Sequence, residues 1–261
     1  MITVLSPAKR LNLDPPSLPD GLAATEPQFA TEAAKLARIA RGRSVAELRR
    51  LMHISEPLAR LNQERFAAFS FKPAAGLAKP AALVFDGDTY AGLEARTLDP
   101  DALRWAQNHL RILSGLYGLL RPLDAIQAHR LEMGSRLANP RGATLYDFWG
   151  RRIALALNAA ALAADASVLM NCASREYFSA VDRKALRVRV ISPVFLEQDQ
   201  GEPKIVSFYA KKARGAMARF ITEHRLTDPA EIRSFDVGGY RFRADLGSED
   251  APVFLRTVTP E

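Results

Sequence analysis

The sequence predicts a mixed α/β (α+β) fold, built as one compact domain with a central mixed sheet flanked by helices. Short apolar runs rich in β-branched residues alternate with longer segments whose apolar residues recur at helical spacing. The 261 residues contain no repeat, low-complexity tract or long linker, so residues 1–261 are expected to form a single domain. Hydrophobic residues make up 48% and charged residues 25%, values that exclude a disordered, collagenous or coiled-coil protein.

The strands are expected where short apolar runs stop at proline, glycine or aspartate. Ile2–Leu5 is the first such run, and it ends at Ser6-Pro7. Later runs of the same kind lie at residues 81–85, 111–113, 167–170, 188–191 and 205–208. Near the end of the chain, residues 240–243 and 253–255 are expected to pair as antiparallel strands.

Helical patterns and their capping signals lie between several of these runs. Apolar residues share one face from residue 29 to residue 40, and Ser44 with Glu47 forms the capping box of a second helix. Asp99, followed by proline, predicts the start of a helix that runs to residue 109. Two more helices are expected at residues 148–164 and 210–224. The helical segment at about residues 29–75 is interpreted as an insertion in the domain.

The charge balance favours an anionic partner. The chain carries 36 Lys and Arg against 29 Asp and Glu, a formal net charge of +7, which makes polyanions plausible partners, although many basic proteins never touch nucleic acid. Cys172 is the single cysteine, so no internal disulfide forms and a reducing cytosol is favoured. The first apolar run is too short for a signal peptide, and no apolar stretch reaches the ~20 residues of a spanning helix. We therefore expect a cytoplasmic protein without a membrane partner, and no protein partner is predicted.

Polar or glycine-rich loops follow nearly every expected strand. If the sheet is largely parallel, these loops gather at its carboxyl edge, where such sheets bind ligands. The candidate catalytic side chains are Asp86, Asp147, Asn171, Ser174 and Glu176. Ordinary turn and cap chemistry explains each loop as well, and the acids could instead form structural ion pairs.

The helix at 210–224 carries the clearest basic signal. Four cations lie within about half of the helix circumference: Lys211, Lys212, Arg214 and Arg219. Gly215 lies inside that arc, where the missing side chain would let a phosphate backbone approach closely. Close helix packing explains this glycine equally well, and the cations alone could form a solvated face.

A second basic element has the layout of a helix-hairpin-helix. Arg49 and Arg50 precede a short turn in which His53 and Ser55 flank Ile54, with helical patterns on both sides. The usual form has glycines around the central apolar residue, and Glu56 adds a negative charge here. A plain helical hairpin therefore remains an open alternative.

Metal and nucleophile signatures are poor. The histidines are scattered without a paired spacing, at positions 53, 109, 129 and 224. Cys172 lies close to Arg175, a position that could lower a thiol pKa, but a buried structural cysteine is favoured. The sequence predicts no metal site and no cofactor.

Several strings resemble the YaaA peroxide-stress family in order along residues 6–215. They are Ser6-Pro7-Ala8-Lys9, Phe85-Asp86-Gly87-Asp88, and the segments 113–124, 130–134, 145–150, 171–177 and 208–215. The resemblance implies a cytosolic bacterial protein of the oxidative-stress response that helps to keep intracellular free iron low. It also implies a DNA-binding protein with a mixed α/β fold, a positively charged cleft and a helix-hairpin-helix. The family usually has Pro-Tyr before Arg-Leu-Glu-Met-Gly, where this chain has Ala128-His129.

Two functions are predicted from these observations. The first is largely sequence-independent binding of double-stranded or structured DNA, which should weaken steeply with salt. Its expected contacts are Lys9, Arg10, Arg49, Arg50, His53, Ile54, Ser55, Arg121, Arg130, Lys211, Lys212, Arg214, Gly215 and Arg219. The alternative is an enzyme acting on a nucleotide or nucleic-acid base, with the strand-end residues as the reacting pocket and Lys9 and Arg121 holding phosphate. Direct iron sequestration is disfavoured because no histidine or cysteine cluster occurs.

Overall fold

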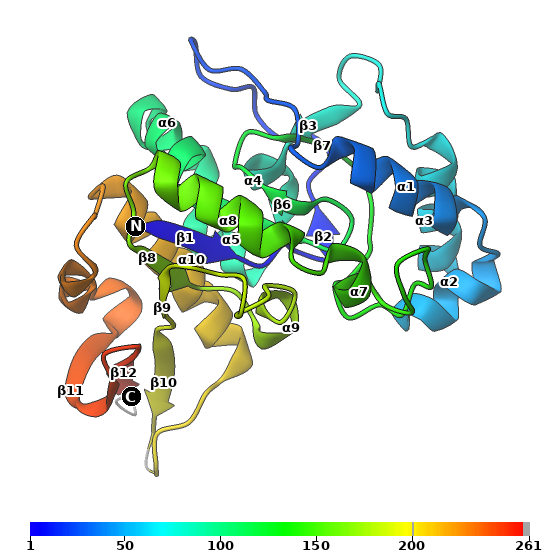
Figure 1. Cartoon of the computed structure of the whole chain (residues 1–261). Coiled ribbons are helices and arrows are strands. Elements are labelled where there is room, and N and C mark those ends of the chain that lie inside the picture. The colour runs from blue at the N-terminus through cyan, green and yellow to red at the C-terminus, as the bar shows by residue number, and fades with distance from the viewer. Residues whose placement is uncertain (200, 258–261) are drawn as a thin grey trace.

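A five-stranded sheet organises the fold in the computed structural model, which describes residues 1–199 and 201–257 (Figure 1). Its strand order is β6-β5-β1-β8-β9. β1 (Ile2–Leu5) lies in the middle and pairs in parallel with β5 (Leu110–Ser114) and β8 (Val168–Asn171). β9 (Arg189–Ile191) is parallel to β8, whereas β6 (Gly118–Leu120) is antiparallel to β5. The predicted mixed α/β class is therefore confirmed.

Helices cover both faces of this sheet. α8 (Arg152–Ala163) crosses in front of it and contacts β6, while α10 (Ser207–Glu223) lies behind and contacts β1 (Figure 1). α10 also packs along α5 (Asp88–Leu93) and against α6 (Pro100–His109). All four residues of β1 are buried, because a central strand between two helical layers is apolar on both faces.

The helical segment lies at one side of the molecule. It consists of α1 (Ala30–Arg41), α2 (Val45–Met52) and α3 (Glu56–Ala68), with both α1 and α2 packed on α3 (Figure 1). The predicted capping box is present: Glu47 N donates to Ser44 Oγ at 3.3 Å, and Ser44 N donates to Glu47 Oε2 at 2.8 Å. α2 and α3 form a helical hairpin whose turn begins with His53 in the left-handed region, at φ +53.

The run at 81–85 was expected to be a strand, and this prediction is wrong. It forms the short helix α4 (Ala81–Val84), followed by β4 (Phe85–Asp86), which pairs with β2 (Arg10–Leu11). The first two amides of α4 donate to the carbonyls of Asp124 and Pro122, at 2.9 Å each. A short buried apolar run has no period that separates helix from strand, so these contacts from a distant segment decide.

The run at 205–208 is also not a strand. α10 begins at Ser207, and Ile205 is 59% exposed, so no sheet covers this segment. The strand of this region is instead β10 (Val194–Gln198). The helix expected at 148–164 is divided into α7 (Leu145–Trp149) and α8, because Gly150 between them has φ +46.

A second, three-stranded sheet closes the chain. β12 (Ala251–Thr257) pairs with β10 in parallel and with β11 (Arg241–Ser248) in antiparallel, which confirms the antiparallel pair expected there. Short 3-10 helices precede β11 at Pro229–Ser234 and Val237–Gly239, and another follows α5 at Ala95–Thr97. Elsewhere β3 (Ala78–Pro80) pairs with β7 (Ala125–Gln127), and α9 (Arg175–Phe178) follows β8.

Candidate nucleic-acid interface

The carboxyl ends of four parallel strands meet at one edge of the sheet, as the sequence predicted. Side chains from two of these ends are joined directly: Ser6 Oγ accepts from the amide of Ser174 at 2.8 Å, and the two hydroxyl oxygens lie 3.3 Å apart. Tyr90 in α5 donates its hydroxyl to the carbonyl of Ser6 at 3.1 Å. At the ends of β8 and β9, Asn171 Nδ2 donates to Ser192 Oγ at 3.1 Å. Ser6, Asn171 and Ser174 therefore belong to one polar edge.

The acidic candidates at this edge have defined partners. Glu176 Oε1 accepts from the amide of Gly134 at 2.9 Å. Glu132 binds two predicted cations, since Lys9 Nζ lies 3.1 Å and an Arg130 nitrogen 2.9 Å from its carboxylate oxygens. The cationic charge of Lys9 and Arg130 is thus partly balanced by one carboxylate.

Two pockets lie on either side of α9. The first, the hairpin pocket, has a volume of about 690 Å³ and adjoins the α2–α3 turn; it is lined by residues that include Arg43, Glu47, Arg50, His53, Glu132, Gly134, Arg136 and Glu176. The second, the arginine pocket, has a volume of about 460 Å³ and opens at the ends of β8 and β9; it is lined by residues that include Asn171, Arg175, Phe178, Arg183, Ser192, Pro193, Ile205 and Arg214. α9 carries a residue of each pocket, Arg175 and Glu176.

The structure thus brings together only part of the predicted cation set. Arg50 and His53 line the hairpin pocket, and Arg214 lines the arginine pocket. Lys211 lies 3.6 Å from an Asp88 carboxylate oxygen, and Lys212 is exposed one position farther along α10.

Other predicted residues have structural partners away from the pockets. Arg219 donates to the carbonyl of Glu94 at 2.9 Å and pairs with Glu223, so it ties α10 to the end of α5. Arg121 follows the antiparallel strand β6, at the opposite edge of the sheet, and pairs with Asp124 at 3.0 Å. Gly215 faces α5, where a Cβ would lie 1.8 Å from the carbonyl oxygen of Thr89.

The remaining candidates lie in caps, turns or pairs. Asp147 caps α7 with Thr144, and Asp86 pairs with Arg10 at 2.8 Å. In the hairpin, the carbonyl of Arg49 accepts from the amide of Ile54 at 3.2 Å, and Ile54 is buried. Ser55 begins α3 without a capping hydrogen bond from its side chain.

Four residues of the two pockets were missed by sequence reasoning: Arg136, Arg175 and Arg183 as contacts, and Ser192 as a strand-end hydroxyl. Ser192 directly follows the run at 188–191, so the rule applied to the other strands would have found it. Arg136 and Arg183 lie in loops and Arg175 begins the four-residue helix α9, so no helical or strand periodicity marks them.

Cys172 is a buried structural residue at the end of β8. Burial raises the pKa of its thiol to about 12, although the guanidinium of Arg214 acts in the opposite direction. Within residues 1–199 and 201–257, no group of three His, Cys, Asp or Glu side chains is placed to hold a metal ion.

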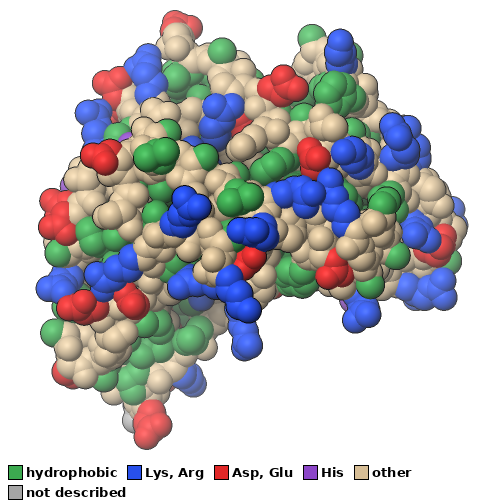
Figure 2. Space-filling model, in the orientation of Figure 1, with side chains coloured by type: hydrophobic (Ala, Val, Ile, Leu, Met, Phe, Trp, Pro, Cys, Tyr) green, Lys and Arg blue, Asp and Glu red, His purple; other side chains and the backbone are tan. Residues whose placement is uncertain are grey.

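Lys and Arg side chains gather in a band over the lower middle of the face shown in Figure 2.

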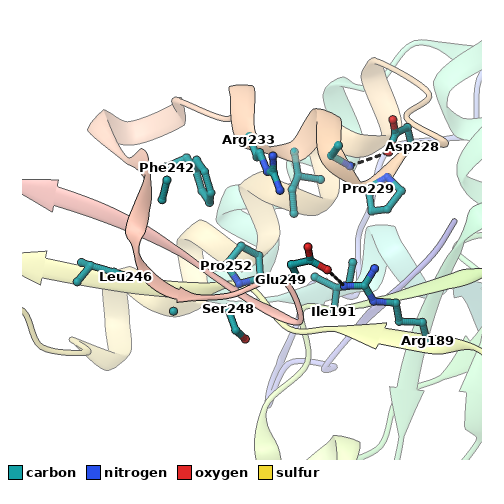
Figure 3. A pocket seen from close by; sticks show the side chains of 14 residues that line it. Arg189, Ile191, Asp228, Pro229, Arg233, Phe242, Leu246, Ser248, Glu249 and Pro252 are labelled. Carbon is teal, nitrogen blue, oxygen red and sulfur yellow. Dashed lines mark hydrogen bonds and ion pairs between the residues drawn. The ribbon is translucent and has the colours of Figure 1, made fainter.

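A further pocket lies between β9 and the β11–β12 hairpin (Figure 3). There Arg189 pairs with Asp250 at 2.6 Å and with Glu249 at 3.1 Å. The guanidinium of Arg189 in this pocket is therefore neutralised by neighbouring carboxylates, whereas the arginines of the arginine pocket have no such partner among the described residues.

Comparison with known proteins identifies the family. Residues 1–246 match the family described as peroxide stress protein YaaA. The chain belongs to the YaaA family of peroxide stress proteins. The UPF0246 protein of Cereibacter sphaeroides strain ATCC 17025 is 66% identical over 259 residues, which are 99% of this chain and 100% of the relative. UPF0246 proteins of Ruegeria pomeroyi and Roseobacter denitrificans are 57% and 54% identical, each over 98% of both chains.

The family assignment confirms the resemblance found in the sequence. It connects this chain to peroxide stress, which is the coarser part of the predicted function. In the part of the chain that the structure describes, no helix combines the length and apolar character needed to cross a membrane.

Proposed function

We propose that this protein binds the phosphate backbone of DNA during peroxide stress, on the face that carries the hairpin and arginine pockets. One observation supports the proposal most strongly. Five arginines line these pockets and have no carboxylate oxygen within 4.0 Å among residues 1–199 and 201–257: Arg50, Arg136, Arg175, Arg183 and Arg214. They come from α2 (Arg50), the loop before α7 (Arg136), α9 (Arg175), the loop after α9 (Arg183) and α10 (Arg214), so folding gathers charge that is dispersed in the sequence.

Unpaired arginines suit a polyanion. A cation that already has a carboxylate partner gains little from a phosphate, because one pairing replaces the other. Among the described residues the five arginines keep their donors free, and a guanidinium binds phosphate through paired N–H groups. Contacts of this kind go to the backbone and carry no sequence information, so the binding should be largely sequence-independent.

A charge-reversal experiment tests this proposal. In the variant Arg50→Glu/Arg136→Glu, repulsion of the phosphates should weaken binding of a short duplex on the order of 100-fold. The matched control is Arg60→Glu/Arg104→Glu, which changes the net charge equally at residues outside both pockets that pair with Glu56 and Asp101. Gel-shift titration of duplexes with 5′-hydroxyl ends measures both. If the two variants lose affinity equally, net charge alone accounts for binding and the proposed face is rejected.

A second candidate function is catalysis on a nucleotide or base. Glu176 favours it, because its carboxylate lines the hairpin pocket and only Oε1 accepts a hydrogen bond among the described residues. Oε2 is then available as a general base. The test is incubation with modified DNA and nucleotides, with product analysis by mass spectrometry. Turnover that disappears in Glu176→Gln while DNA binding persists supports catalysis; no turnover across a broad panel argues against it.

The cellular part of the proposal concerns iron and location. We propose that the protein acts in the cytoplasm and that its loss raises intracellular free iron under peroxide stress. Electron paramagnetic resonance of chelatable iron in whole cells, with and without the gene, measures this. Equal iron in both strains during peroxide exposure would contradict the iron role and leave the DNA proposal intact.

A further inference from the structure

The arginine pocket differs in charge from the other described pockets. Within residues 1–199 and 201–257, its 13 lining residues include Arg175, Arg183 and Arg214 and no aspartate or glutamate. The hairpin pocket contains three glutamates besides its arginines, and the pocket of Figure 3 contains Asp228 and Glu249. Three guanidinium groups around one cavity repel each other unless an anion lies between them. The pocket therefore has the charge of an anion site.

Neutral donors complete this site. Ser192 Oγ accepts a hydrogen bond from Asn171 Nδ2 at 3.1 Å, so its own proton is left for a further acceptor. Asn171 is itself held, because its Oδ1 accepts from the amide of Ala173 at 3.1 Å. These groups stand at the carboxyl ends of β8 and β9 and are fixed by the sheet rather than by a mobile loop. A ligand would meet a preorganised hydroxyl beside the three guanidinium groups.

Much of the remaining lining is apolar. This apolar wall consists of Phe178, Val181, Pro193, Val194, Phe195 and Ile205. The guanidinium of Arg183 lies 5.8 Å from the centre of the Phe178 ring, so charge and aromatic surface adjoin. The volume of about 460 Å³ would hold about fifteen waters at roughly 30 Å³ each, far more than a phosphate needs. A ligand that fills it has an anionic end and a larger apolar part.

We propose that the arginine pocket binds a nucleoside monophosphate, with its phosphate monoester between the three arginines and its base against the apolar wall. A monoester carries about two negative charges at neutral pH, and a backbone diester carries one. Three unneutralised arginines match the monoester better. The same group occurs in a free mononucleotide and at a phosphorylated DNA end. This inference rests on the proposed DNA-binding face and goes beyond backbone binding, because it assigns a particular phosphate ligand to the three arginines of this pocket.

Isothermal titration with the four deoxynucleoside monophosphates tests the inference directly. We expect at least one to bind with a Kd below about 1 mM, and the corresponding nucleoside and inorganic phosphate to bind at least about tenfold more weakly. The variant Arg183→Gln/Arg214→Gln should weaken nucleotide binding by about tenfold or more. The matched control Arg187→Gln/Arg38→Gln removes two exposed arginines outside the pocket and should bind like the wild type. Circular dichroism confirms that each variant is folded, and Arg175→Gln provides a second variant at an exposed position.

Duplexes with 5′-phosphate and 5′-hydroxyl ends separate the two sources of the ligand. If the wild type prefers the phosphorylated duplex and the double variant loses this preference, the ligand is a phosphorylated DNA end. If the wild type binds both duplexes equally well, the ligand is a free nucleotide. The inference is overturned if none of the four nucleotides binds, if the folded pocket variants bind like the wild type, or if phosphate or nucleoside alone binds as tightly. If the protein binds the duplex but no nucleotide, this inference is rejected and the DNA proposal is retained. If it binds a nucleotide but no duplex, the DNA proposal is rejected and this inference is retained.

Discussion

His129 stands where the resemblance to the family implies a tyrosine, and it is buried. Its ring nitrogen Nδ1 lies 2.8 Å from the carbonyl oxygen of Gln127. Its ring meets Tyr117 and Phe85 edge-on, at centroid distances of 5.3 and 6.5 Å. The imidazole thus packs among aromatic rings, but it can acquire a charge there. Burial lowers its pKa to about 4 from the ordinary value of 6.5.

This shift predicts a loss of stability in mild acid. Because the folded protein holds His129 neutral, the stabilisation is complete above pH 6.5 and is lost as the pH falls toward 4. Between about pH 7.5 and 4.5, this residue should cost about 2.5 kcal/mol of unfolding free energy. His129→Phe fills the site without titrating and should lose correspondingly less over the same range. Urea denaturation at the two pH values measures the difference, and parallel losses in both proteins would contradict the assignment.

Cys172 gives a second prediction for a single residue. With its thiol pKa raised to about 12 by burial, the thiolate fraction near pH 8 is about one in ten thousand. The native protein should therefore react with iodoacetamide or hydrogen peroxide far more slowly than the urea-unfolded chain. Mass spectrometry of alkylated samples measures this. Rapid labelling in the native state would indicate a reactive cysteine, which the buried position excludes.

At the scale of elements, the contact between α5 and α10 depends on two glycines. A Cβ on Gly92 would lie 2.0 Å from the carbonyl oxygen of Lys212, and one on Gly215 would lie 1.8 Å from that of Thr89. The two helix backbones touch here, and this contact holds the basic segment of α10 beside the strand ends. Packing is thus a sufficient reason for Gly215, as the sequence left open.

Replacing Gly215 with alanine should destabilise the protein by about 3 kcal/mol or more, because the clash is with backbone that cannot move aside. Gly201→Ala is the control, since a Cβ there meets no atom within 4 Å and should change stability by less than about 0.5 kcal/mol. Thermal unfolding of the two variants compares them. A Gly215→Ala protein as stable as the wild type would mean that α5 and α10 are farther apart than described.

The elements that the sequence predicted correctly are those with local signals. Ser44 and Glu47 mark α2, and Asp99 accepts from the amide of Ala102 at 2.7 Å at the start of α6. The segments at 81–85 and 205–208 carry no such signal, and tertiary contacts decide them. The same holds for side chains: the position of Arg219 on its helix was predictable, but its binding to α5 was not.

At the scale of the whole molecule, the carboxyl edge of the sheet could be predicted because parallel strands place their loops together. The pairing of Ser6 with Ser174, 168 residues apart, follows from the order of the strands. Which cations converge there could not be predicted, because the position of a lysine or arginine in the sequence does not show whether a carboxylate neutralises it in the fold. Lys9 was expected to contact DNA and pairs with Glu132, whereas Arg136 and Arg183 were not among the predicted contacts and have no carboxylate partner among the described residues.

This distribution of charge predicts how DNA binding depends on salt. If the five unpaired arginines each neutralise a phosphate, the slope of log affinity against log salt is about −4.5, from roughly −0.9 per contact. Neutralising one of them in Arg136→Gln should reduce the magnitude of the slope by about 1. Arg104→Gln, on α6 and paired with Asp101, should leave it unchanged. Fluorescence anisotropy from about 50 to 200 mM salt measures all three proteins. Each contact with a phosphate releases counterions, so the slope reports the number of such contacts. A slope near zero would therefore show that these arginines do not contact phosphates, despite the net charge of +7.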